Sequence, residues 1–229
     1  MNNLSEKDLK ITQIFLDVVE RDLDFVGLNI GNNNAKHPGV TGGTVQQGII
    51  RLITNNGIEG NSIIGQHRGD STNKIKEIIN TFKPLLINSN PLERESIWNS
   101  LFSGSGTKNI GNYLNSECLA SIDVALWDIV GKLNGLPVHK IIGQTRRSIP
   151  VYGTYQPRHE DFRGYLEEAS ELKSKNFKAY KIHPGFMSTK DTIRTIEEIR
   201  KLLGPDFTLM LDPNNGYDFQ KALEIGEAL

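Results

Sequence analysis

Two short polar patterns in the second half of the sequence combine residue types that could do acid–base chemistry. Lys181 and His183 are separated by one residue, and Asp212 and Asn214 are separated by a proline. Residues two apart in a strand share a face, so each pattern directs its two polar side chains the same way. An aspartate beside an amide suits a hard cation such as Mg²⁺, and a lysine and a histidine facing that cation suit proton transfer. Polar residues are also common where strands end, so either pattern alone is weak evidence for chemistry.

Strands and helices alternate around these patterns. The expected strands are Ile149–Tyr155, Lys178–Pro184 and Thr208–Asn214, and the expected helices are about Asp161–Lys175 and Asp191–Leu203. Strand, helix and strand in units of about 30 residues predict successive βα units and a parallel sheet. If both pairs point into a barrel, Lys181, His183 and Asp212 converge at the carboxyl ends of its strands, where such barrels place catalysis.

The first part of the chain predicts an α+β unit. The β-prone runs are Lys10–Glu20, Thr44–Thr54 and Ile58–Gly65, and helical patterns start at Ser71 or Thr72, at Pro91 and at Leu114. Asn56-Gly57 predicts a type I′ hairpin between the second and third strands. The longest helix is expected to end at Leu133, with Gly135 as a left-handed cap. Its residues expected to be buried are Leu119, Ile122, Leu126 and Ile129.

The composition excludes several classes of protein. The chain has 229 residues, with 26 Lys and Arg against 27 Asp and Glu, which does not favour a nucleic-acid or membrane-surface binder. Its only cysteine, Cys118, rules out an intramolecular disulfide and a cysteine-built zinc site. No signal peptide or membrane-spanning run is present, so a cytoplasmic protein is expected. Neither a dinucleotide fingerprint nor a phosphate loop occurs.

Two segments resemble the signatures of a known family. Ala120–Lys132, followed by Pro137, resembles the helix signature of the mandelate racemase and muconate-lactonizing group of the enolase superfamily. Leu209–Asn214 resembles the second signature of that group. The resemblance implies an α+β capping domain at 1–140, with a three-stranded antiparallel sheet plus helices. It also implies a partial α/β TIM-like (β/α)8 barrel of about three βα units at 141–229.

The resemblance also implies a chemistry. Members of the group bind Mg²⁺ at the barrel mouth, the metal holds a carboxylate substrate, and a base removes the proton α to that carboxylate. By position, Asp212 is the implied first metal ligand, His183 the base and Lys181 the residue that tunes it. Many members carry a lysine where His183 stands, and a histidine that only hydrogen-bonds substrate is the alternative. Asn214 and His37 are the implied substrate-binding residues, His37 from a capping-domain loop that closes over substrate.

Other notable side chains receive structural roles. Trp127 and Asp128 of the helix signature are expected to pack and to make helix–barrel hydrogen bonds. His67, His139 and His159 are expected at the surface.

The barrel implied by the resemblance is incomplete in this sequence. A full (β/α)8 barrel takes about 250 residues, and residues 149–229 supply three strands at most. We therefore expect the N-terminal fragment of a Mg²⁺-dependent enzyme, first an acid-sugar dehydratase and otherwise a racemase, epimerase or cycloisomerase. Asp212 is one of three expected carboxylate ligands, so Mg²⁺ binding by the fragment should be weak or absent. The competing interpretation is a non-catalytic remnant or binding module. The intact enzyme is expected to be a homo-oligomer that acts on a small carboxylate such as an acid sugar, and a separate C-terminal half is a conceivable partner.

Overall fold

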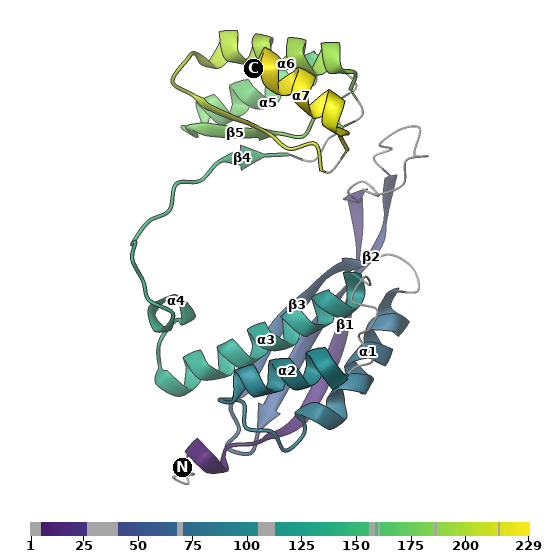
Figure 1. Cartoon of the computed structure of the whole chain (residues 1–229), viewed down its shortest axis with the longest axis vertical. Helices are drawn as coiled ribbons and strands as arrows, with labels where there is room; N and C mark the ends of the chain where they lie inside the picture. The colour runs from purple at the N-terminus through teal and green to yellow at the C-terminus, as the bar shows by residue number, and fades with distance from the viewer. Residues whose placement is uncertain are drawn as a thin grey trace. The chain divides into compact units, whose positions relative to one another are not determined.

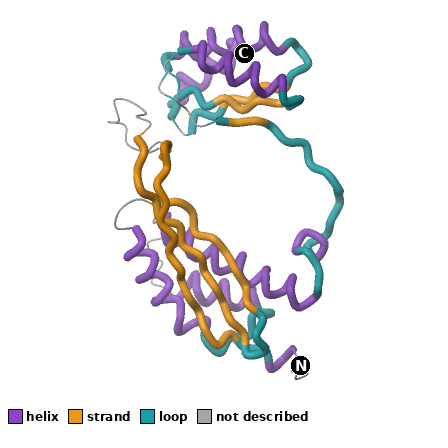
Figure 2. The backbone as a smooth tube through the Cα atoms, turned by 180° about the vertical axis from the view of Figure 1, so that it is seen from behind, coloured by secondary structure: helices purple, strands orange, loops and turns teal. Residues whose placement is uncertain are grey.

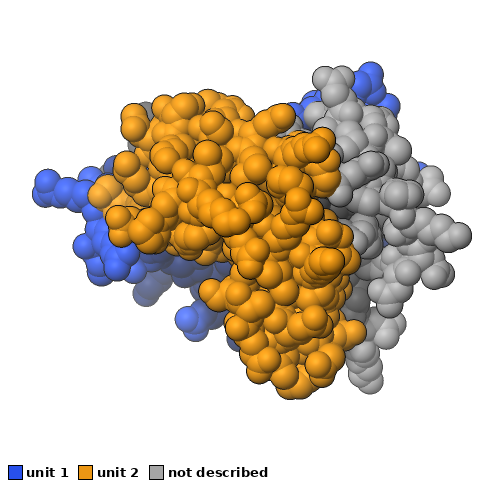
Figure 3. All heavy atoms as spheres, turned by 90° about the horizontal axis from the view of Figure 1, so that it is seen from above, with its two compact units in different colours: residues 1–23, 44–147 blue, residues 24–43, 148–229 orange. Residues whose placement is uncertain are grey.

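The chain folds into two units, each with its own hydrophobic core. The computed structural model describes residues 6–26, 41–67, 71–104, 113–155, 159, 161–185, 187–214 and 216–229. Unit 1 comprises residues 1–23 and 44–147, and unit 2 comprises residues 24–43 and 148–229 (Figure 3). Within the described part, no helix has the length and apolar character needed to cross a membrane.

Unit 1 contains a three-stranded antiparallel sheet, as predicted. Its strands are β1 (Ile11–Val26), β2 (Thr41–Thr54) and β3 (Glu59–His67), in the order β1-β2-β3. The β2–β3 pairing is antiparallel. Side-chain bonds from Thr44 to Asp22 and from Arg51 to Asp17 show that β1 and β2 also run in opposite directions.

The loop between β2 and β3 is a hairpin, but not of the predicted type. The N–H of Gly57 donates to Thr54 O at 3.0 Å, and Gly57 has a φ of 83° whereas Asn56 is not among the residues with positive φ. This is a type I turn followed by a left-handed glycine, so the type I′ prediction is wrong. The Asn56 side chain accepts from Ile58 N at 3.2 Å and stabilises the loop from within.

Helices cover one face of this sheet. They are α1 (Ser71–Leu86), α2 (Arg94–Gly104) and α3 (Tyr113–Asn134), with a short α4 (Val138–Ile141) after them and a 3₁₀ turn at Glu6–Asp8 before β1 (Figure 1). The four α3 residues predicted to be buried are at most 6 % exposed. Gly135 caps α3 with a φ of 61°, as expected. However, α2 starts at Arg94 and not at Pro91, because Glu93 N donates to Asn90 O and closes a turn there.

Unit 2 is built from three successive βα units, and its sheet is parallel as predicted. Its elements are β4 (Gly153–Thr154), α5 (Phe162–Ser174), β5 (Ala179–Ile182), α6 (Thr189–Leu203), β6 (Thr208–Leu211) and α7 (Phe219–Ala228). The strand order is β4-β5-β6, and both pairings are parallel. The helices lie on one face of the sheet (Figure 2).

All three strands of unit 2 are shorter than expected. Ile149 and Val151 precede β4 and are 76 % and 69 % exposed. The β5–β6 ladder closes with Asp212 N donating to Ile182 O, after which Pro213 offers no N–H. The candidate site residues His183 and Asp212 therefore lie just beyond the ends of β5 and β6.

Candidate active site

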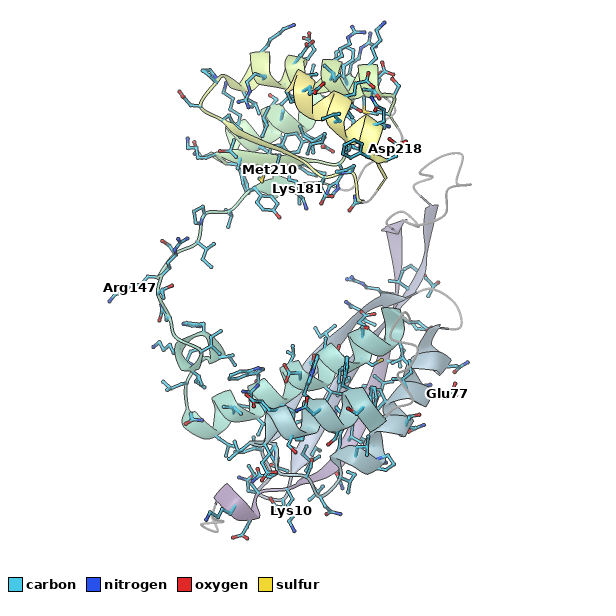
Figure 4. The ribbon with its side chains drawn as sticks, in the orientation of Figure 1. Lys10, Glu77, Arg147, Lys181, Met210 and Asp218 are labelled. Carbon is cyan, nitrogen blue, oxygen red and sulfur yellow. The ribbon has the colours of Figure 1, made fainter. Side chains whose placement is uncertain are left out.

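Polar side chains gather on the sheet face of unit 2 that the helices leave open. Thr154, Lys181 and Met210 are cross-strand neighbours, so their side chains share one face. Figure 4 shows Lys181 and Met210 on the side of the sheet away from the helices. Tyr180 and Ile182, with their β6 partners Leu209 and Leu211, point instead into the core beneath α5 and α6.

Lys181 and Asp212 form the charged centre of this face. Lys181 Nζ lies 3.0 Å from Asp212 Oδ2, and their side chains are 23 % and 36 % exposed. The bond to Asp212 raises the pKa of Lys181. Two hydrogen bonds lower the pKa of Asp212: the larger effect comes from the main-chain N–H of Asn214 and the smaller from Lys181. Both groups are therefore charged near neutral pH.

The chain bends sharply after Asp212 and brings Asn214 back toward β5. Asn214 has a φ of 50°, a left-handed conformation that asparagine tolerates better than most residues. Its N–H donates to Asp212 Oδ1 at 2.9 Å, which leaves the carboxylate with one bond on each oxygen. The turn thereby fixes the orientation of both side chains.

His183 is buried, and one of its ring nitrogens is held from the β6 side. Its Nδ1 lies 3.1 Å from Asp212 O and 2.7 Å from Asn214 Nδ2. A carbonyl can only accept and an amide nitrogen can only donate, so the two contacts favour different tautomers of His183. Turning the Asn214 amide by half a rotation brings its oxygen to Nδ1 and makes both contacts consistent with a protonated Nδ1. The structure thus brings together Lys181, His183, Asp212 and Asn214, four of the five residues singled out from the sequence.

Two further side chains belong to this face and were not anticipated. The ring centroid of Tyr152 lies 5.5 Å from Lys181 Nζ, and Thr154 Oγ1 donates to Lys181 O at 3.0 Å. The signal that could have identified them is the same spacing of two, since Tyr152, directly before β4, and Thr154, its last residue, are two positions apart.

The structure gives a partial account of three further residues named from the sequence. His37 lies outside the described residues. Asp128 accepts a hydrogen bond within unit 1, where Asn61 N of β3 donates to its Oδ2 at 2.8 Å, and its expected hydrogen bond to the barrel stays a prediction. Trp127 packs beneath Arg94, whose guanidinium carbon is 3.4 Å from the ring centroid.

The three remaining histidines differ from one another. His139 is exposed, as expected, and the side chain of His67 lies outside the described residues. His159 is not a free surface residue, because its Nε2 lies 2.8 Å from Oε1 of the buried Glu168. His159 is held against α5 by this contact. The signal for it in the sequence was a charged residue, Glu168, on an otherwise apolar face of the helix.

The described residues do not by themselves form a Mg²⁺ site. No group of three histidine, cysteine, aspartate or glutamate side chains converges anywhere in the described ranges. Asp212 offers one carboxylate, and both of its oxygens already accept hydrogen bonds. Mg²⁺ requires near-octahedral oxygen coordination, so Asp212 could serve only as one ligand among several.

Comparison with known proteins identifies related sequences along most of the chain. Residues 32–143 match the family described as mandelate racemase / muconate lactonizing enzyme, N-terminal domain, and residues 164–229 match the enolase C-terminal domain-like family. Arabinonate dehydratase of Saccharolobus solfataricus is 30 % identical over 152 residues, which are 64 % of this chain and 40 % of that protein. D-galactarolactone cycloisomerase of Agrobacterium fabrum is 30 % identical over 154 residues, 66 % of this chain and 40 % of that protein.

Solved structures agree with these matches. D-glucarate dehydratase of Agrobacterium tumefaciens, solved in complex with magnesium, is 26 % identical and superposes with a TM-score of 0.77 over 96 % of this chain and 58 % of that chain. The matched region therefore spans about two fifths of the curated relatives and somewhat more than half of this solved structure.

Proposed function

This chain belongs to the mandelate racemase / muconate lactonizing enzyme group of the enolase superfamily, and we propose that it supplies the proton-transfer residues of an enzyme acting on a sugar acid. The reaction removes the proton next to the substrate carboxylate. A dehydratase is the first choice, and a racemase, epimerase or cycloisomerase uses the same first step. The support comes from relatives named as a dehydratase of arabinonate and a cycloisomerase of galactarolactone.

The observation that carries this proposal is the way His183 is held. When Nδ1 is protonated and donates to Asp212 O, Nε2 bears the lone pair that can accept a proton. Among the described residues, no hydrogen bond engages Nε2. His183 is thus oriented at one nitrogen and available at the other, which is what a general base requires.

Lys181 has a different part in the proposed reaction. Its raised pKa keeps it as an ammonium, so it is suited to attract the substrate carboxylate and not to abstract a proton. Tyr152 lies beside Lys181 and Asn214 beside His183, and they offer hydroxyl and amide groups for a polyhydroxylated substrate. His37 is proposed as a further substrate contact.

Asp212 is proposed as one ligand of a Mg²⁺ site whose other carboxylates are not among the described residues. The support is the magnesium-containing glucarate dehydratase and the position of Asp212 at the end of β6. When bound, Mg²⁺ stabilises the negative charge that develops on the substrate carboxylate as the proton leaves. This chain's own contribution is to hold Asp212 charged and oriented through Lys181 and the Asn214 main chain.

The two-part architecture of this family is proposed for the chain. We propose residues 1–140 as the capping domain and residues 141–229 as the first three βα units of a (β/α)8 barrel. The two family matches, to an N-terminal and a C-terminal domain, support this division.

A second candidate is a protein that retains the fold without the reaction. The observation favouring it is that, in the part of the chain that the structure describes, Asp212 is not joined by two further metal-ligating side chains. Such a chain would bind a carboxylate through Lys181 and would exchange no protons.

The test is α-proton exchange in D₂O with Mg²⁺, followed by proton NMR over a panel of sugar acids. The preparation joins residues 1–229 to the C-terminal part of the Saccharolobus arabinonate dehydratase. Exchange is expected in this chimera and should vanish in His183→Asn. His139→Asn, on the exposed short helix α4, is the matched control and should exchange normally.

Two results contradict the proposal. A folded chimera that exchanges no sugar acid favours the non-catalytic candidate, and exchange that survives His183→Asn removes His183 as the base. The 229-residue chain alone is expected to be inactive, so Asp212-dependent exchange by it would disprove the need for further ligands.

A further inference from the structure

The main-chain carbonyl of His183 accepts a hydrogen bond from the helix side of the sheet. Tyr165, on α5, donates its hydroxyl to His183 O at 2.7 Å, and the contact is buried. His183 lies one residue beyond the last residue of β5, and the bonds at the two ends of the β5–β6 ladder use the carbonyls of Lys178 and Ile182, so alternation directs that of His183 away from β6. Tyr165 therefore donates to a carbonyl that the β5–β6 ladder does not use.

The hydroxyl of Tyr165 is suited to this contact because its own position and protonation are fixed. The side chain is 2 % exposed, and burial together with the nearby Glu168 raises the pKa of Tyr165. It remains a phenol that donates. The ring of His159 packs edge-on against it, with centroids 5.2 Å apart and planes at 71°.

The ring of His159 contacts Tyr165 by passing over Gly164, the residue before Tyr165 on α5. A Cβ at Gly164 would lie 2.0 Å from Nδ1 of His159, so a larger residue there would displace the imidazole. The Nε2 of His159 meets Glu168, which also accepts from the hydroxyl of Tyr180. The ring of Tyr165 is thus held within a packed polar cluster between α5 and the sheet.

His183 is consequently held at two points from opposite sides. Its carbonyl is bound by Tyr165 of α5, while its imidazole Nδ1 lies between Asp212 O and the Asn214 amide beyond β6. We propose that Tyr165 is a positioning residue that orients His183 for proton abstraction by fixing its main chain. The role in proton abstraction rests on the proposed function. The orientation of His183 by Tyr165 does not, since it can be measured without catalysis.

Tyr180 provides a matched control for Tyr165. Both tyrosines are at most 2 % exposed, both belong to the interface between α5 and β5, and both donate to a buried oxygen. The acceptor of Tyr180 is the carboxylate of Glu168, and that of Tyr165 is the carbonyl of His183. Replacing either by phenylalanine removes one buried hydroxyl, but only Tyr165→Phe releases His183.

The experiment uses the 229-residue chain with ¹³C- and ¹⁵N-labelled histidine. Tyr165→Phe is expected to shift or broaden the imidazole signals of His183, which are assigned through His183→Asn. Tyr180→Phe should leave them in place, and His139 in unit 1 serves as an internal reference in both variants. Unchanged His183 signals in Tyr165→Phe, or equal changes in the two variants, would overturn the proposal.

A kinetic readout separates positioning from stability. In the chimera described above, Tyr165→Phe should lower kcat by about tenfold with KM within about twofold, since a small misplacement of a reacting group costs rate more than binding. Tyr180→Phe should change kcat by less than about twofold. Equal losses of kcat in the two variants contradict the inference. If the wild-type chimera shows no exchange, the proposed function has failed, and the NMR result alone decides the role of Tyr165.

If Tyr165→Phe unfolds unit 2, a milder change at the same position still tests the proposal. Placing 3-fluorotyrosine at position 165 keeps the ring and the hydroxyl and alters only the strength of the hydrogen bond to His183 O. The His183 imidazole signals should then move, while those of His139 stay fixed. A fluorinated chain with unmoved His183 signals contradicts the inference.

Discussion

The edge strand β3 of unit 1 and the edge strand β6 of unit 2 meet very different surroundings. Side chains of α3 bind the outer main-chain groups of β3. Asp128 Oδ2 accepts from Asn61 N at 2.8 Å, Lys132 Nζ donates to Glu59 O at 2.7 Å, and Ser121 lies 3.3 Å from Ile63 O. In the described part of unit 2, β6 pairs with β5 alone.

The bonding pattern of β6 shows which of its groups face outward. The N–H groups of Thr208 and Asp212 donate to Lys178 O and Ile182 O of the β5 side. The intervening Leu209 and Leu211 therefore direct their N–H and C=O groups away from β5. An uncovered edge of this kind is a template for pairing with another strand. The helix signature of this family therefore has a structural role, because its side chains cover the β3 edge, whereas in the residues described nothing equivalent covers the β6 edge.

The largest expected effect concerns the open edge. We expect the 229-residue chain to self-associate through β6 and Leu209→Pro to shift it toward monomer, because proline removes an outward N–H and blocks pairing. Met210→Pro removes an N–H on the β5 side and should unfold unit 2. Size-exclusion chromatography with light scattering measures the association.

Leu209→Ala is the control for the loss of the leucine side chain, and it should associate like the wild type. A sharp monomer peak with cooperative unfolding for the unmodified chain would show that the β6 edge is already closed.

The convergence of the candidate site residues could be predicted from the sequence, whereas the covering of the β3 edge by α3 could not. Lys181, His183 and Asp212 converge because a spacing of two and a βα repeat determine which side chains share a strand end. The contacts of Asp128 depend instead on where α3 lies across β3, which no local pattern encodes. The donor to His183 O depends likewise on the distance between α5 and β5. The hairpin loop was misjudged because Asn-Gly supports both a two-residue and a three-residue connection.

The second prediction uses the only cysteine to test how firmly α3 closes unit 1. Cys118 is fully buried in α3, and burial, with a contribution from Glu117, raises the pKa of its thiol to about 12. An unfolded chain releases this proton above pH of about 9, whereas the folded chain retains it. Cys118 should therefore lower the free energy of unfolding of unit 1 by about 1.4 kcal/mol per pH unit between about pH 9 and about pH 12.

Denaturant unfolding of wild type and Cys118→Ala across this pH range checks the slope. The stability of Cys118→Ala should fall less steeply with pH, and thiol labelling of the native chain at pH 8 should be slow. Equal slopes in the two chains would mean that the thiol titrates normally and that α3 does not hold it closed.

The third prediction removes the strongest bond at the closed edge. Asp128→Ala leaves Asn61 N without its acceptor and removes the ion-pair partner of Lys132. It should destabilise unit 1 by about 1–2 kcal/mol, since bonds to charged groups contribute more than neutral ones. Asp123→Ala, on the same helix, loses an ion pair with Arg94 at 3.8 Å. It should cost about 0.5 kcal/mol or less, as expected for a partly exposed pair. Equal losses measured by urea unfolding would contradict a specific role for the β3 edge.

The smallest expected effect separates edge capping by Lys132 from a simple helix ion pair. Lys132 Nζ lies 2.7 Å from Asp128 Oδ2 one helical turn away and 2.7 Å from Glu59 O, and its side chain is 43 % exposed. Lys132→Met should cost about 0.5 kcal/mol. Salt screens the attraction between exposed charges but leaves a short bond to a carbonyl largely intact. If Lys132 caps β3, a difference in unfolding free energy between wild type and Lys132→Met should persist at about 1 M salt, where the Debye length is about 3 Å. A difference that disappears at high salt would reduce Lys132 to an ion-pair partner of Asp128, and the closure of β3 would then depend on Asp128 and Ser121.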